Sequence, residues 1–235
     1  MELLQRFAVK WIRQVGQALA LCHDRRLLHR DVRPENIFLT ETEDVRLGDF
    51  GVAGVMDHYG KAEITGHEEA RAPELFWGYA STTSSDIWSL GATLWTALTG
   101  VMPPRDGGHN VCAEIRDLSP HVSQGLGQIV RKAINSSPAD RYTSVRELDQ
   151  ALARVTCGSR DFMEIAPHDG HLRCWSGQGV GTVRPVLVCV LSESARRVHV
   201  TARYVLTGRR ITEFDASVPR SSLTKYLRSV FVRLR

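Results

Sequence analysis

Hydrophobic residues in the first part of the chain recur with the period of an α-helix. Between residues 7 and 22 they lie three or four positions apart, which predicts an amphipathic helix with one buried face. Further segments show helical patterns of the same kind, and breaks that contain proline separate most of them. They cover residues 85–99, 110–117, 123–134 and 144–155. The first two thirds of the chain are therefore expected to be mainly helical.

Short apolar runs interrupt this pattern between the first and second expected helices. Residues 36–39 and 45–47 are apolar runs joined by the polar segment 41–44, which predicts two strands connected by a turn. Residues 52–71 contain glycine, mix polar and apolar side chains, and show no period. We therefore expect a long loop there, and such loops are usually functional or mobile.

The pattern changes near Cys157, where we place a domain boundary. Residues 158–183 are rich in glycine and are predicted to form a linker, and residues 184–235 a small sheet-plus-helix module. The elements expected in this module are strands at 186–191, 198–206 and 210–214, a hairpin turn at 207–208, and a helix at 221–234. The predicted class is α+β, with a mainly helical domain over residues 1–157 followed by a small β-rich module that ends in a helix.

Composition indicates a globular protein without a disulfide framework. The chain has 235 residues, of which 43% are hydrophobic, enough for one or two domains with a core. Its five cysteines include no C-x-x-C pair, which argues against a zinc ribbon, and we interpret them as small buried residues in a reducing compartment. Residues 1–6 lack the apolar segment of a secretion signal, and the apolar stretch 87–98 is too short to span a bilayer. We therefore predict a cytoplasmic protein without a transmembrane segment.

Positive charge is concentrated at the C-terminal end. Residues 1–157 carry 17 Lys and Arg against 20 Asp and Glu, a net charge of −3, whereas residues 184–235 carry 11 against 3, a net charge of +8. A basic segment of this kind suggests an anionic partner for the C-terminal module. The arginines are not interleaved with a set of aromatic residues, so an ordinary solvated face is the other interpretation.

Two short polar segments carry the candidate chemistry. Residues 29–36 have the sequence HRDVRPEN, and residues 49–51 have the sequence DFG. Asp31 supplies a carboxylate that can orient a hydroxyl nucleophile, while Asn36 and Asp49 supply oxygen ligands of the kind that magnesium prefers. Phosphoryl transfer needs these groups and little covalent chemistry besides.

Further motifs follow in a fixed order. Residues 72–74 have the sequence APE, a DIWSLG segment begins at Asp86, and Arg141 lies in an ADRY segment. Together with the two polar segments they resemble the C-terminal lobe of the eukaryotic-like (bacterial-type) serine/threonine protein kinases, over about residues 5–156. Before residue 29 we find no glycine-rich loop, strand lysine or helix with a partner glutamate, the elements that hold ATP in a kinase. We therefore expect the C-lobe of a catalytic domain whose N-lobe is missing.

The resemblance implies a role for each catalytic residue. Asp31 corresponds to the catalytic base or hydroxyl-orienting carboxylate, and Arg33 stands at the place of the lysine that contacts the transferred phosphate. Arginine keeps the charge but brings a planar, bulkier group. Asn36 and Asp49 correspond to the magnesium ligands. The implied cofactors are ATP and Mg²⁺, and the implied partner is a protein substrate.

Other residues take supporting roles in the same resemblance. Arg30 corresponds to the arginine that anchors a phosphorylated activation loop, with Thr65 as the possible phosphosite and Tyr59 as a second acceptor. Plain loop polarity explains either hydroxyl equally well. Structural roles in packing the loops and the lobe are implied for His29, Phe50, Gly51, Glu74, Asp86 and Arg141.

Two features depart from the kinase pattern: the segment before the APE motif and the missing N-lobe. Active serine/threonine kinases usually carry Gly-Thr shortly before the APE motif, with the hydroxyl bound to the catalytic Asp, whereas this chain has Gly66-His67. Residues 177–183 resemble a kinase glycine loop with one residue deleted, so a permuted N-lobe is an alternative to a linker that enters a strand. Such a lobe needs a lysine shortly afterwards, and the single lysine after Lys132 is Lys225, in the last predicted helix.

Three hypotheses for function follow. The first is a serine/threonine protein kinase that transfers the γ-phosphate of ATP to protein hydroxyls, with an N-lobe encoded upstream or supplied by a partner. The proline-containing RPEN segment at residues 33–36 favours serine and threonine over tyrosine, because tyrosine kinases typically lack a basic residue at position 33. The second hypothesis is a catalytically inactive kinase-like scaffold or binding protein. The third is a truncated gene product without a role of its own.

Overall fold

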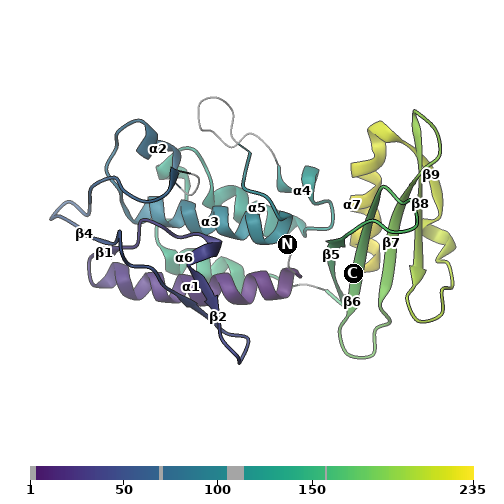
Figure 1. The fold of residues 1–235 in the computed structure, drawn as a ribbon, viewed down its shortest axis with the longest axis horizontal. Helices are drawn as coiled ribbons and strands as arrows, with labels where there is room; N and C mark the ends of the chain where they lie inside the picture. Colours follow the sequence, from purple (N-terminus) through teal and green to yellow (C-terminus); the bar gives the residue numbers. More distant parts are fainter. Residues whose placement is uncertain (1–3, 69–70, 105–113, 157) are drawn as a thin grey trace.

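The computed structural model describes residues 4–68, 71–104, 114–156 and 158–235. Within these residues a mainly helical part and a β-rich part lie end to end along the long axis of the molecule (Figure 1). The α+β class predicted from the sequence is confirmed. The predicted boundary at Cys157 and the first half of the helix predicted over 110–117 lie outside the described residues.

Amphipathic helices build the helical part around one hydrophobic core. The longer helices described there are α1 (Gln5–Asp24), α3 (Thr83–Thr99), α5 (Gln124–Ala133) and α6 (Val145–Ala153). Short helices between them are α2 (Pro73–Phe76) and α4 (Ile115–Leu118). Since Ile12, Val15 and Leu19 are buried on one face, α1 packs against α3 and α6. In the parts of the chain that the structure describes, we find no helix whose length and hydrophobicity would let it span a bilayer.

Helix α3 forms the centre of this core, and 12 of its 17 residues are buried. Thr82 and Ser85 form a capping box at its start, and Gly100, with a φ of 75°, ends it. Gly91 faces α5, where an added β-carbon would come within 2.7 Å of the Ala133 side chain. The close approach of α3 and α5 therefore depends on glycine at this position.

Two short antiparallel strand pairs frame the loops that carry the candidate chemistry. Strand β1 (Leu27–Leu28) pairs with β4 (Gly54–Val55), and β2 (Ile37–Leu39) pairs with β3 (Val45–Leu47). The strands predicted at 36–39 and 45–47 are thus confirmed. The HRDVRPEN segment runs from the end of β1 to the start of β2, and the DFG segment follows β3. The strand pairing therefore brings the two segments together.

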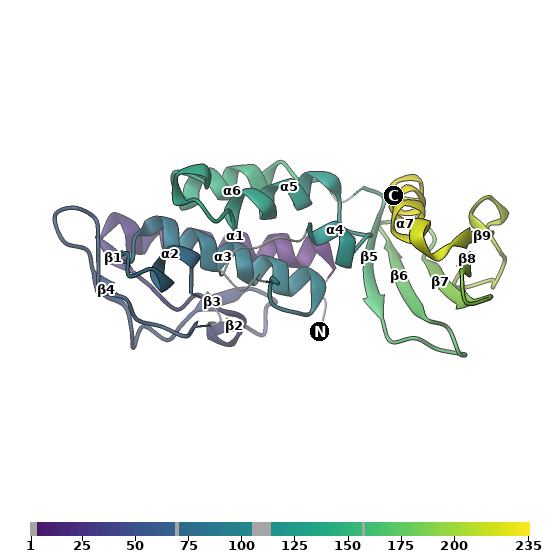
Figure 2. The same ribbon diagram turned by 90° about the horizontal axis from the view of Figure 1, so that it is seen from above.

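The C-terminal part is an antiparallel sheet covered on one face by a helix (Figure 2). Its strands pair in chain order, and the face beneath the helix is filled mainly by buried valines and aromatic residues. The elements are β5 (Arg160–Ile165), β6 (Arg173–Gly179), β7 (Val186–Ser192), β8 (Arg197–Tyr204), β9 (Ala216–Pro219) and α7 (Leu223–Leu234). The predicted strands at 186–191 and 198–206 and the predicted final helix are confirmed.

Two predictions for this region are wrong. Residues 158–183 are not an irregular linker, because they contain β5 and β6, which pair with each other along the whole length of β5. Gly177 lies within β6, where an added β-carbon would overlap the buried Phe162 ring. Glycine is therefore needed here for close packing against Phe162 and is not the sign of a flexible linker. The strand predicted at 210–214 is instead a 3₁₀ turn over Thr212–Phe214, and the edge strand β9 follows it.

The sheet topology also weakens the hypothesis of a permuted N-lobe. The glycine-rich segment 177–183 forms the end of β6 and the turn into β7, within a sheet whose strands pair in chain order. Lys225 lies in α7, outside the sheet. The sheet lies at the opposite end of the molecule from β1 and β4 (Figure 1).

A buried carboxylate joins the two parts. Asp161 of β5 accepts hydrogen bonds from the backbone amides of Gln5 (3.1 Å) and Arg6 (2.8 Å) at the start of α1. These amides belong to the first turn of a helix, where the chain itself offers no acceptor. Near the surface, Arg228 of α7 forms an ion pair with Asp117 at 2.6 Å. The β-rich part therefore caps the first helix of the helical part.

Candidate active site

The loop that carries Asp31 is held by a buried carboxylate from α3. Asp86 is 1% exposed and accepts hydrogen bonds from the backbone amides of His29 (3.0 Å) and Arg30 (2.9 Å). It also contacts the His23 imidazole at 2.9 Å. Arg30 has a φ of 67°, in the left-handed region that most residues avoid, so these bonds hold a turn that the local chain does not favour.

Asp31 is almost completely buried and is contacted from two sides. The Asn36 amide nitrogen donates to the Asp31 backbone oxygen at 2.8 Å and to its carboxylate at 2.9 Å. On the other side, the His67 backbone amide donates to the carboxylate at 3.1 Å, and the His67 imidazole Nδ1 lies 3.0 Å from Oδ2. Burial by itself raises the pKa of Asp31, but the hydrogen bonds from His67 and Asn36 outweigh it and lower the pKa. The carboxylate is therefore held in its ionised form.

The two predicted metal ligands come from neighbouring strand ends. The Gly48 amide donates to the Asn36 backbone oxygen at 2.9 Å, just before Asp49. The Asn36 side-chain nitrogen is bound to Asp31, so the side-chain oxygen is the atom that could bind a metal. One Asp49 carboxylate oxygen accepts from the Gly51 amide at 3.2 Å. An amide oxygen and a carboxylate are hard donors, so this pair fits Mg²⁺.

Packing under the loop joins the HRD and DFG segments. The His29 imidazole is buried, and its Nε2 lies 3.0 Å from the Gly48 carbonyl oxygen. The Phe50 ring meets the His29 ring edge to face, with centroids 4.8 Å apart. Asp49 has a φ of 57°, which turns the chain sharply between the strand and the DFG glycine. The structure thus places His29, Phe50 and Gly51 beneath and beside the candidate catalytic groups.

Arg30 reaches the long loop that was predicted over residues 52–71. Its guanidinium donates to the carbonyl oxygens of Val52 (2.6 Å) and Glu63 (2.9 Å). The Thr65 hydroxyl donates to the same Val52 oxygen at 3.3 Å. The structure therefore brings the predicted anchor and the predicted phosphosite to one carbonyl group. Gly54 allows this arrangement, because a β-carbon there would overlap the Arg30 guanidinium.

Arg33 lies on the surface side of the same loop. Its Nε donates to the carboxylate of Glu35, two positions later in the chain, at 2.7 Å. The hydrogen bond from Arg33 is the largest effect on this carboxyl and lowers the pKa of Glu35, although burial opposes it. An incoming phosphate would compete with Glu35 for the guanidinium.

Glu74 and Arg141 form a buried bidentate ion pair away from Asp31. Arg141 Nη1 lies 2.7 Å from Glu74 Oε1, and Nη2 lies 2.6 Å from Oε2. Both side chains are buried, and Arg141 also donates to the backbone oxygens of Asn135 and Ser84. These bonds fix the short helix α2, which follows the segment 52–71, to the helical core.

His67 is the site residue whose position the sequence left open. It was recognised as a departure from the Gly-Thr pattern, without a contact assigned to it. In the structure its backbone amide and imidazole both contact Asp31, although the side chain is 65% exposed. The preceding Gly66, with a φ of 85°, lies so close to Arg30 that a β-carbon would overlap the Arg30 carbonyl oxygen. The signal present in the sequence was the pair Gly66-His67, which stands where active serine/threonine kinases carry Gly-Thr.

Comparison with known families agrees with this geometry. The family model described as protein kinase domain matches residues 2–154, which is more than half of the chain. The chain belongs to the protein kinase family. The match ends where α6 ends and leaves the β-rich part outside it.

Bacterial members of the kinase family are among its relatives. The serine/threonine-protein kinase PknA of Mycobacterium tuberculosis (strain H37Ra) is 34% identical over 164 residues, which cover 66% of this chain and 38% of PknA. The serine/threonine-protein kinase Pkn1 of Myxococcus xanthus is 30% identical over 255 residues, which cover 96% of this chain and 36% of Pkn1. The chain thus spans little more than a third of the length of these relatives.

Proposed function

We propose that this chain carries the catalytic loop of a serine/threonine protein kinase, which transfers the γ-phosphate of ATP to a hydroxyl group of a protein substrate. The observation that carries the proposal is the arrangement around Asp31: an ionised, buried carboxylate, bonded to Asn36, on a loop that packs against the DFG turn through His29. A carboxylate in this state can orient a serine or threonine hydroxyl and accept its proton. Relatives named serine/threonine-protein kinases support the choice of acceptor.

ATP and Mg²⁺ would be the cofactors. When bound, the metal neutralises charge on the phosphates, and its ligands from this chain would be the Asn36 amide oxygen and the Asp49 carboxylate. Arg33, on the same loop, would orient the transferred phosphate after exchanging Glu35 for it. Thr65 would be the site whose phosphate Arg30 holds, because both side chains already share the Val52 carbonyl oxygen.

A further segment that grips ATP is part of this proposal. Phe38 and Leu39 of β2, directly after Asn36, are each 56% exposed, so an apolar strand next to the catalytic loop is uncovered. A nucleotide-binding lobe would cover it, either from a longer form of the protein or from a partner. A basic partner-binding face on the β-rich part has less support, because several of its arginines pair with acidic neighbours, among them Arg210, Arg228 and Arg233.

The test is transfer from γ-labelled ATP to a generic basic protein, with and without Mg²⁺. It uses the chain starting at Met1 and, beside it, a version extended by the in-frame codons upstream. We expect label on serine and threonine after acid hydrolysis, and its loss both without Mg²⁺ and in Asp49→Asn. Label on tyrosine, or transfer that survives Asp49→Asn, would contradict the proposal.

The structure also supports one alternative, an inactive kinase-like scaffold. The His67 imidazole contacts both carboxylate oxygens of Asp31, the group that a substrate hydroxyl would have to reach. In this alternative His67→Thr does not create transfer activity in any version of the chain, and Asp31→Asn leaves the cellular role unchanged. A truncated gene product would show neither activity nor a phenotype on deletion.

A further inference from the structure

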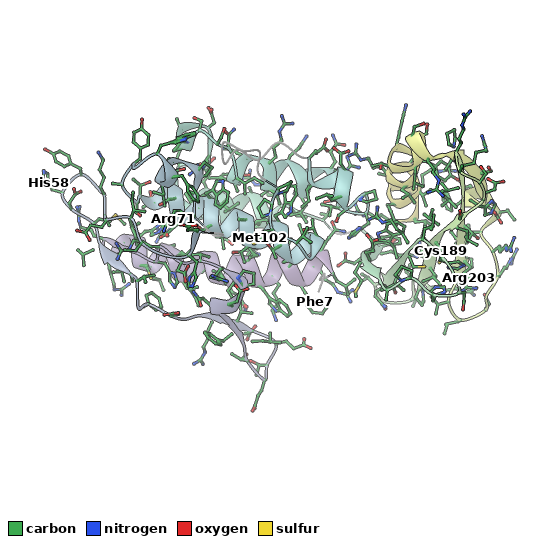
Figure 3. The ribbon with its side chains drawn as sticks, turned by 45° about the horizontal axis from the view of Figure 1, so that its top comes forward. Phe7, His58, Arg71, Met102, Cys189 and Arg203 are labelled. Carbon is green, nitrogen blue, oxygen red and sulfur yellow. The ribbon has the colours of Figure 1, made fainter. Side chains whose placement is uncertain are left out.

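Four potential metal ligands meet at one place in the β-rich part, far from Asp31 in the sequence. They are His168, His171, Cys174 and Cys189, and their ligand atoms all lie within 4.8 Å of one another. The first three follow the spacing H-x₂-H-x₂-C in the β5–β6 connection and the start of β6. The fourth comes from β7, where Cys189 is the register partner of Cys174. Figure 3 labels Cys189 in this sheet.

The two cysteines lie on the sheet face opposite α7. Their strand neighbours Trp175 and Val188 belong to the core beneath α7, so the alternation of side chains directs Cys174 and Cys189 to the other face. Both cysteines are nevertheless buried, at 0% and 1% exposed. The histidines of the connection contact them there, which explains part of this burial.

The distances suit a tetrahedral metal site. His171 Nδ1 lies 3.5 Å from Cys174 Sγ, and His168 Nε2 lies 3.7 Å from Cys189 Sγ. With Zn–N near 2.0 Å and Zn–S near 2.3 Å, neighbouring ligand atoms of a tetrahedral zinc ion are about 3.3–3.8 Å apart. These two sulfur–nitrogen pairs are therefore already at the separation that one shared ion would set.

A supporting carboxylate orients one of the imidazoles. His168 Nδ1 lies 3.1 Å from the Asp169 carboxylate, which leaves Nε2 directed at Cys189. Metal-bound histidines commonly donate their other ring nitrogen to a carboxylate in this way. The turn that follows is tight, because Asp169 and Gly170 both have positive φ values and the His171 amide donates to the His168 carbonyl oxygen at 2.9 Å.

Binding of a metal ion here would change the protonation of both cysteines. A divalent cation would displace the thiol protons, and the two thiolates would then balance its charge.

We propose that His168, His171, Cys174 and Cys189 bind one Zn²⁺ ion in a tetrahedral Cys₂His₂ site that fastens the β5–β6 connection to the sheet. Two thiol protons are released on binding, and no redox step is involved. Sulfur and imidazole ligands in tetrahedral arrangement select zinc over magnesium or calcium, and four protein ligands leave no open position for catalysis. The role is therefore structural, and it is independent of the kinase proposal.

The test measures metal in the full chain, expressed with zinc in the medium and freed of any affinity tag under reducing conditions. We expect about one zinc per chain, and none in Cys174→Ser or Cys189→Ser. After chelation and addition of Co²⁺, the chain should show the intense visible bands of tetrahedral cobalt with thiolate ligands. Zinc should also raise the thermal unfolding midpoint and protect both thiols from alkylation.

Matched variants separate loss of the site from loss of the fold. Cys22→Ser on α1 and His199→Gln on β8 remove the same residue types elsewhere and should leave the zinc content unchanged. His168→Gln alters a side chain that is 30% exposed, so a folded chain that binds zinc much more weakly is expected. A folded wild-type chain that takes up neither zinc nor cobalt would overturn the proposal. So would equal zinc in Cys174→Ser, or a Cys174–Cys189 disulfide in the protein as isolated.

Discussion

At the scale of single residues, the Asp31 carboxylate is the group on which the proposed chemistry depends. Its charge is set by competition between burial, which raises its pKa, and donors from His67 and Asn36, which lower it. A kinase of the usual pattern has a threonine hydroxyl where this chain has the His67 imidazole. The imidazole therefore has two opposite effects: it favours the ionised carboxylate, and it occupies the space next to it.

Replacement of His67 by alanine tests the first effect. The backbone amide stays, but the imidazole contact at 3.0 Å is lost, so the pKa of Asp31 should rise toward its ordinary value. The measurement is an NMR titration of carboxyl-¹³C-labelled Asp in wild type and His67→Ala, with Asp31→Asn to assign the signal. A carboxyl whose pKa is lower in the folded than in the unfolded state stabilises the fold at pH values above its unfolded-state pKa, and this contribution is lost as the pH falls. Because the contribution is smaller in His67→Ala, the variant should lose less stability than wild type over the same fall in pH. An unchanged Asp31 titration would contradict the assigned contact.

The Glu74–Arg141 pair provides a test of stability at the same scale. Arg141→Ala leaves a buried, uncompensated carboxylate, and we expect it to lower the free energy of unfolding by about 3–5 kcal/mol. Urea unfolding followed by circular dichroism measures the change. Arg146→Ala is the matched control, because it breaks an ion pair with Asp24 in which both side chains are about half exposed. The control should change little, and equal losses in both variants would contradict a special role for the buried pair.

At the scale of secondary-structure elements, glycines in two helices should respond oppositely to the same substitution. Gly91→Ala in α3 would bring a β-carbon within 2.7 Å of Ala133 and 2.9 Å of Ile134, so it should force α3 and α5 apart and cost about 1–3 kcal/mol. Gly125→Ala in the first turn of α5 meets nothing within 4 Å and should be neutral or stabilise by up to about 0.5 kcal/mol. Chemical unfolding measures the free energy of unfolding of both variants. An unchanged value in Gly91→Ala would contradict the close packing of α3 and α5.

Elements were predictable from the sequence where one face of them is buried. The period of Ile12, Val15 and Leu19 gave the first helix, and α3, α5 and α6 were placed to within a few residues. The strands of residues 158–183 were missed because glycine and charged residues dilute their pattern, and only the structure shows the Phe162 ring packed over Gly177. The edge strand β9 was missed because its short segment has little apolar alternation.

The candidate sites were predictable to different degrees. Local motifs located Asp31, Asn36 and Asp49 because the residues lie close together in the chain. The contact of His67 with Asp31 depends on how the long loop returns, which has no periodic signal. The four-ligand cluster was missed because its cysteines form no C-x-x-C pair, and the fourth ligand reaches it through strand register. The H-x₂-H-x₂-C spacing was the signal present in the sequence.

At the scale of the whole molecule, His121 lies where the two parts meet. Its ring faces Phe231 of α7, and its backbone oxygen accepts hydrogen bonds from Gln5 and Arg235. Burial, with the nearby guanidinium groups of Arg235 and Arg173, lowers its pKa to about 3. Protonation of this imidazole would place a positive charge in an apolar contact between two basic side chains.

Stability should therefore depend on pH through His121. The unfolded imidazole takes up a proton near pH 6.5 and the folded one near pH 3, so its contribution is complete above about pH 6.5 and is lost as the pH falls. Each unit of pH across this window corresponds to about 1.4 kcal/mol. Urea unfolding between pH 7.5 and pH 5 should show this slope in wild type and a shallower one in His121→Asn. An identical slope in the variant would contradict the assignment.

The most direct measurement is the rate of phosphate transfer from ATP by wild type and Asp31→Asn, each in the version of the chain that binds ATP. The exposed Asp140→Asn serves as the control, because it makes the same chemical change on the surface of the same lobe. If Asp31 orients the acceptor hydroxyl, Asp31→Asn should lower kcat by about 10²-fold or more in a chain that remains folded, while Asp140→Asn keeps the wild-type rate. Transfer by Asp31→Asn at the wild-type rate would contradict the proposed function.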